Sequence, residues 1–134
     1  MLLAAFALLL TVAAVGAVAR GGVVERRGAT LFALAWAVSL GAQALSGETS
    51  PGPWLPAIDA AVLIALGRLA WRSIRPWPVY ACGFQLLTVA GDIAKWVETG
   101  LDVRLHLTFL AATSFGAVGV LAMGAWFPPR TQQK

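Results

Sequence analysis

The chain has 134 residues, of which 59% are hydrophobic and only 12% are charged, about half the ~25% charged fraction of a typical soluble domain. Its mean hydropathy is +0.77, and this much apolar surface cannot be buried inside one small globule, which argues against a soluble monomer. The formal net charge is +4. Because the basic residues lie at the ends of apolar segments, we expect lipid head groups as their partners and no nucleic acid.

Five apolar segments follow one another along the chain, each near the ~20 residues that cross a bilayer. The first resembles the apolar part of a secretory signal, but no basic residue precedes it, so we interpret it as a retained span. Glycine and charged residues follow it, a Pro- and Gly-rich connector at residues 46–53 follows the second segment, and Pro76 and Pro78 separate the third from the fourth. The predicted spans are approximately residues 2–19, 29–45, 57–73, 79–97 and 105–127.

These segments predict an all-α fold, a polytopic membrane helix bundle in which residues 1–134 form one integral-membrane domain. Five transmembrane helices are the first interpretation. Four are the alternative, with the first segment removed or lying in the membrane interface. Two connectors and the tail with Arg130 and Lys134 carry most of the basic residues, while only Lys95 and Arg104 lie on the opposite side. Since cytoplasmic loops hold the excess of Lys and Arg, we expect an N-out/C-in orientation, in a bacterial cytoplasmic (inner) membrane.

Six arginines are expected at the cytoplasmic face, where a long side chain can lie along apolar surface with its charge among the phosphates. The alternative to snorkelling is specific binding of anionic lipid or of an acidic partner protein. With six arginines at this face, an attraction to anionic lipid without specificity is expected. The six predicted head-group contacts are Arg20, Arg26, Arg27, Arg68, Arg72 and Arg75.

Polar residues on the fourth segment recur at intervals of three and four, which places them on one face of a helix. Lipid would penalise an aspartate there by roughly 2.5–3.5 kcal/mol, so this face is expected to meet other helices or water. Further polar residues lie toward the same outer ends of neighbouring segments. If these faces meet, they could form a vestibule that accepts a cation or relays a proton. The alternative is that they only reach interfacial water. The candidate polar pathway comprises Gln43, Asp59, Gln85, Thr88, Asp92, Lys95 and His106.

Small residues recur on the last segment at multiples of four, at Ala112, Gly116 and Gly124. Such spacing lets two helix backbones approach closely. The partner helix belongs either to the same chain or to a second subunit. Trp36 lies at mid-depth and is expected to fill a gap between helices, because no ring of aromatic residues around it is visible in the sequence.

The sequence contains no nucleophile beside a base and no cluster of metal ligands, so no enzymatic activity, cofactor or metal is expected. Cys82 is the single cysteine and is expected to be a small buried side chain. The first functional hypothesis is an accessory or scaffold subunit that acts by helix packing, with itself or other membrane subunits as partners. The alternative is a pore or an ion or proton pathway, holin-like or transporter-like, that uses the polar residues.

Overall fold

The computed structural model describes residues 2–46, 54–97, 100 and 102–127. In this part of the chain it contains five helices: α1 (Leu2–Ala19), α2 (Val23–Ser46), α3 (Trp54–Arg72), α4 (Trp77–Val97) and α5 (Val103–Trp126). The predicted all-α class is confirmed. By length and composition, α2, α3 and α5 are able to cross a membrane. The connector at 47–53 and the tail with Arg130 and Lys134 lie outside the described residues.

The starts of the helices have local causes. Helix α2 begins at Val23 rather than at residue 29, because the Glu25 side chain accepts a hydrogen bond from the Gly22 backbone N–H (2.8 Å) and so caps the first turn. Pro56 and Pro78 lie in the first turns of α3 and α4, where a missing backbone N–H costs nothing. Asp102 caps α5 by accepting a hydrogen bond from the Arg104 backbone N–H (2.9 Å).

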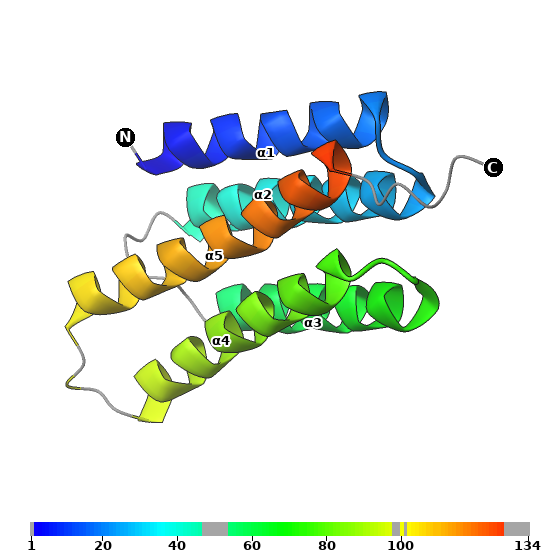
Figure 1. Ribbon diagram of the computed structural model, residues 1–134. Helices are drawn as coiled ribbons and strands as arrows, with labels where there is room; N and C mark the ends of the chain where they lie inside the picture. The colour runs from blue at the N-terminus through cyan, green and yellow to red at the C-terminus, as the bar shows by residue number, and fades with distance from the viewer. Residues whose placement is uncertain (1, 47–53, 98–99, 101, 128–134) are drawn as a thin grey trace.

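Successive helices run in alternating directions and pack side by side (Figure 1). Helix α5 packs most extensively against α4 and α1, α3 packs against α4, and α2 contacts α1, α3 and α5. The five helices therefore form a ring in which α5 closes against α1. One end of the bundle holds the starts of α1, α3 and α5, and we call it the His106 end. The other holds the starts of α2 and α4 and is called the Glu25 end.

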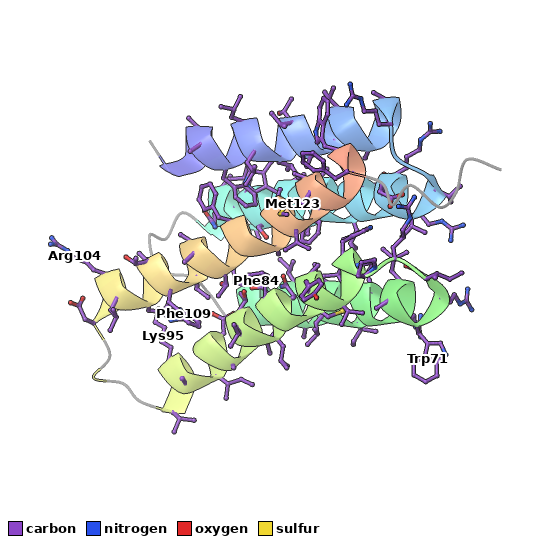
Figure 2. The ribbon with its side chains drawn as sticks, in the orientation of Figure 1. Trp71, Phe84, Lys95, Arg104, Phe109 and Met123 are labelled. Atoms are coloured by element: carbon purple, nitrogen blue, oxygen red, sulfur yellow. The ribbon has the colours of Figure 1, made fainter. Side chains whose placement is uncertain are left out.

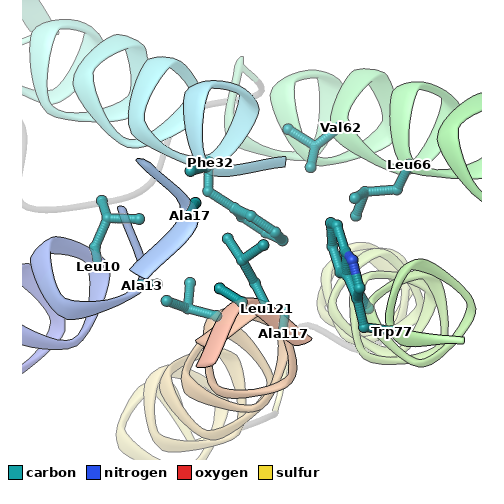
Figure 3. Close-up of a cluster of buried hydrophobic side chains, with 13 residues drawn as sticks. Leu10, Ala13, Ala17, Phe32, Val62, Leu66, Trp77, Ala117 and Leu121 are labelled. Atoms are coloured by element: carbon teal, nitrogen blue, oxygen red, sulfur yellow. The ribbon is translucent and has the colours of Figure 1, made fainter. Parts of the chain in front are cut away.

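The apolar core occupies the half of the bundle nearer the Glu25 end. Phe32 from α2, Leu66 from α3, Trp77 from α4 and Leu121 from α5 point toward one another there (Figure 3). Leu66 and Leu121 are completely buried. This packing closes the interior of the ring on that side.

Close approaches of α4 to its neighbours depend on glycine. The indole of Trp77 lies against Gly28 of α2 and Gly124 of α5, and a Cβ atom at either glycine would overlap it. The ring of Phe84 occupies the same kind of position at Gly116, between α4 and α5 (Figure 2). The two predicted packing glycines, Gly116 and Gly124, thus contact a helix of the same chain.

Candidate functional site

Helices α3 and α4 are joined by a hydrogen-bonded pair in the half of the bundle nearer the His106 end. The Gln85 side-chain amide donates to Asp59 Oδ1 at 2.8 Å and to the Asp59 backbone carbonyl at 3.3 Å. Gln85 is buried, whereas the Asp59 side chain is half-buried. Since an amide is a neutral donor, the negative charge of Asp59 is oriented by this contact but not compensated.

Asp92 and His106 form the second pair, between α4 and α5. His106 Nε2 lies 3.4 Å from Asp92 Oδ1, and the two residues are only 5% and 6% exposed. The carboxyl groups of Asp59 and Asp92 lie within interaction distance of each other. Two carboxyl groups from α3 and α4 therefore share one buried site with a single imidazole beside it.

One oxygen of this site is unsatisfied. Asp92 Oδ2 is buried and has no hydrogen-bond partner among the described residues, and the same is true of His106 Nε2. A buried polar atom without a partner costs about 1–3 kcal/mol, and more when it is charged. The arrangement favours a proton or a cation at the Asp59–Asp92 pair, because either one satisfies the free oxygen and reduces the repulsion between two carboxylates.

A threonine pair joins α4 to α5, with Thr88 lying between Gln85 and Asp92 along α4. The Thr88 hydroxyl of α4 and the Thr113 hydroxyl of α5 are 2.8 Å apart, and both residues are buried. Thr88 lies nine residues before the end of α4 at Val97, about 14 Å along the helix axis. We call these six polar residues, which lie between the His106 end and the middle of the bundle, the polar track; it comprises His106, Asp92, Asp59, Gln85, Thr88 and Thr113.

Two predicted pathway residues lie beside the polar track rather than in it. Lys95 is half-buried one turn beyond Asp92, its charge acts on both Asp92 and His106, and its side chain lies near Phe109 in the space between α4 and α5 (Figure 2). Gln43 is exposed on α2 and does not line the interior of the ring. Ser39, one turn earlier on α2, faces the interior instead.

A cavity of about 280 Å³ adjoins the polar track inside the ring. It extends from Leu55 in the first turn of α3 to Val62, two turns deeper. All five helices contribute to its wall. The residues that line it are Phe6, Phe32, Ala35, Trp36, Ser39, Leu55, Asp59, Val62, Gln85, Thr88, Leu110, Ala111, Ser114, Phe115 and Val118.

Sequence reasoning missed the aromatic side of this cavity. Trp36 lies beside Phe6, with ring centroids 6.1 Å apart, and Phe6 meets Phe115 edge-on at 5.4 Å. Trp36 thus packs between helices as expected, but beside an aromatic residue that the sequence did not indicate. The partners come from α1, α2 and α5, and no spacing within one segment indicates that their faces meet.

Sequence reasoning also missed a buried ion pair at the opposite end. Glu25 is 1% exposed; its Oε1 lies 3.4 Å from Arg75 Nε and accepts a hydrogen bond from the Trp77 indole at 3.3 Å. The available signal was the position of Glu25 three residues after Gly22, which suits a helix cap. Arg75 thus holds α2 against the start of α4.

The remaining predicted head-group arginines are exposed at the Glu25 end. Arg20 lies over the Trp126 ring, 4.8 Å from its centroid, and Arg26 donates to the Val18 carbonyl at 3.1 Å. Arg27, Arg68 and Arg72 are exposed there as well. The helix directions thus gather all six predicted arginines at one end of the bundle.

Among the described residues, no three His, Cys, Asp or Glu side chains are placed to hold a metal ion. Cys82 is a free, half-buried thiol on α4. The chain has also been compared with known proteins. No protein-family model, no curated protein and no solved structure matches it significantly.

Proposed function

We propose that this chain is an integral membrane protein that takes up a proton or small cation at the Asp59–Asp92 pair. The observation that carries the proposal is the buried, unsatisfied Asp92 Oδ2 beside a second carboxyl group. Lys95 supplies one positive charge near Asp92, and a second carboxyl group in a low-dielectric interior is stabilised when a proton or a cation is added. The proposal involves binding and transfer of charge and no chemical reaction.

Membrane insertion of all five helices is part of the proposal. Large apolar side chains are exposed on every helix, among them Val12, Leu34, Ile64, Leu86 and Met123. A surface this apolar is unfavourable in water and favourable against acyl chains. Helix α4 carries Gln85, Asp92 and Lys95 and is not among the three helices that could span by length and composition, but the first two of these residues are buried inside the ring.

The orientation follows from the arginines. Their concentration at the Glu25 end supports a cytoplasmic location for that end, hence N-out/C-in, in a bacterial cytoplasmic membrane. The polar track then begins on the outer side. Packing of Leu66 and Leu121 closes the cytoplasmic half, so a transporter-like site that loads from one side is favoured over an open, holin-like pore.

The accessory-subunit hypothesis remains a prediction. The sequence feature that suggested it is the row of small residues on α5. In the structure, however, Gly116 and Gly124 contact Phe84 and Trp77 of the same chain. Ala112 is exposed. Other membrane subunits or a second copy are the partners that this hypothesis predicts.

The test is ion flux in reconstituted vesicles that carry an imposed membrane potential and contain either a pH-sensitive dye or a dye sensitive to K⁺ or Na⁺. The wild-type chain is expected to move protons or a monovalent cation. Asp92→Asn and Asp59→Asn are expected to reduce this flux to the leak of protein-free vesicles, because an amide cannot hold the charge.

Asp102→Asn is the matched control, since it makes the same chemical change at an exposed helix cap where Asn serves as well as Asp. Wild-type vesicles without flux would refute the proposal. So would variants of Asp59 and Asp92 that conduct like the control.

A further inference from the structure

The charge on the wall of the cavity is negative. Asp59 is the single charged side chain among the described residues that line it, and no Lys, Arg or His is present in that lining. A ligand that complements this wall carries one positive charge, whereas an anion or zwitterion would leave its negative group without a partner.

The volume of the cavity suits a small organic molecule better than a bare ion. About 280 Å³ corresponds to about nine water molecules at ~30 Å³ each. A proton or bare metal ion would leave most of this space, which is lined chiefly by apolar side chains, unfilled. Pockets that bind small organic molecules begin at about this volume and combine apolar walls with few polar groups.

The walls are divided by chemistry. The charged carboxylate and the amide of the lining, Asp59 and Gln85, come from α3 and α4. All the aromatic residues of the lining come from α1, α2 and α5, where Ser39 and Ser114 are the polar residues beside them; these aromatic residues are Phe6, Phe32, Trp36 and Phe115. The contacts of Phe6 with Trp36 and Phe115 hold the three rings together on their own side. Aromatic faces attract organic cations, most strongly in a desolvated site.

We infer that the cavity binds a hydrophobic organic monocation of the ammonium class, with its charged nitrogen near Asp59 and its apolar body against Phe6, Trp36 and Phe115. The inference rests on the proposed function, because the Asp59 carboxylate would hold either the proton or the ammonium group. It adds the chemical class of the substrate. A proton bound at the Asp59–Asp92 pair would be released when the ammonium ligand enters.

The experiment measures binding of benzyltrimethylammonium to the full chain in lipid nanodiscs by isothermal titration calorimetry. Its uncharged isostere, neopentylbenzene, serves as the matched ligand. The wild-type chain is expected to bind the cation at least about tenfold more tightly than the isostere. Titrations in buffers of different ionisation enthalpy are expected to report proton release on binding.

Two variants change the opposite walls. Asp59→Asn is expected to weaken cation binding at least about tenfold, and Trp36→Leu is expected to weaken it about threefold to tenfold. Binding of the isostere is expected to weaken less in both variants. Asp102→Asn and Trp71→Leu are the controls, since Asp102 and Trp71 are exposed outside the cavity. Asp59→Glu keeps the charge and should retain cation preference, which separates the role of the charge from an effect on folding.

Filling the cavity gives an independent variant. Ala111→Phe places a ring in the cavity and leaves the carboxyl pair intact, so it should abolish cation binding. Absence of cation binding in the wild type, or equal affinity for the isostere, would overturn the inference. If the cation does not bind but Asp92-dependent flux is still measured, the further inference fails and the proposed function is kept. If the cation binds but no flux is measured, the proposed function fails and the binding site is kept.

Discussion

Glu25 lies in a charged run that the sequence assigns to the membrane surface, yet its carboxylate is 1% exposed. It joins three parts of the fold, since it caps α2 at Gly22, pairs with Arg75 and accepts a hydrogen bond from Trp77. A buried charge is tolerated when it is paired and hydrogen-bonded. Arg75 and Trp77 lie 50 and 52 residues away along the chain, so local spacing could not identify these two partners.

Removal of the Glu25 charge is expected to destabilise the fold. In Glu25→Gln, the amide oxygen can still accept a hydrogen bond from Gly22, whereas the ion pair with Arg75 and the hydrogen bond from Trp77, both made by the other oxygen, are lost together. We expect the free energy of unfolding in detergent to fall by about 3 kcal/mol, because one partner of a buried pair is left alone. Asp102→Asn, at an exposed position, should change it by less than about 0.5 kcal/mol. Equal effects of the two changes would contradict the assigned role of Glu25.

Helix α4 shows how far periodicity predicts a site. The spacing of Gln85, Thr88 and Asp92 predicts one polar helix face, and in the structure this face lies inside the bundle. Periodicity within one segment sets the rotation of side chains around that helix only. It does not set the rotation of α1 and α2 relative to α4, and for this reason the aromatic wall with Phe6 and Trp36 was not predictable.

The contact of the Trp77 indole of α4 with α2 depends on Gly28. A Cβ there would overlap the Trp77 ring, whereas a Cβ at Gly41 on the same helix meets nothing within 4 Å. We expect Gly28→Leu to lower the free energy of unfolding by about 1–3 kcal/mol relative to Gly41→Leu, as overpacking does in other cores. Both changes gain the same helix propensity, so the difference in detergent unfolding reports the contact alone. Indistinguishable stabilities would show that α2 and α4 are not packed in this way.

At the scale of the whole molecule, composition and segment lengths predicted an all-helical bundle, and five helices are present in the described part of the chain. The ends of the helices were less predictable. Helix α2 starts earlier than the apolar pattern because its cap lies in the charged run. The cavity needs all five helices in register, which is a property of their packing and not of any one segment.

The proposed orientation is testable with single cysteines in a Cys82→Ser background. Gly100→Cys lies between α4 and α5 at the His106 end, and Ser73→Cys lies just after α3 at the Glu25 end. In intact bacterial spheroplasts, a membrane-impermeant maleimide is expected to label Gly100→Cys and to label Ser73→Cys only after permeabilisation. The reverse pattern would invert the topology, and labelling of both without permeabilisation would exclude this arrangement of spans.

The central claim is that the interior site is reached from the His106 end and closed at the Glu25 end. Ser114 lines the cavity, and Leu121 lies in the closed core. The most direct measurement is the rate at which a cationic, membrane-impermeant methanethiosulfonate modifies Ser114→Cys in sealed vesicles of known orientation, again with Cys82→Ser. The account predicts modification from the His106 side only, with Leu121→Cys unreactive from both sides. Modification of Ser114→Cys from the Glu25 side, or from neither side, would contradict it.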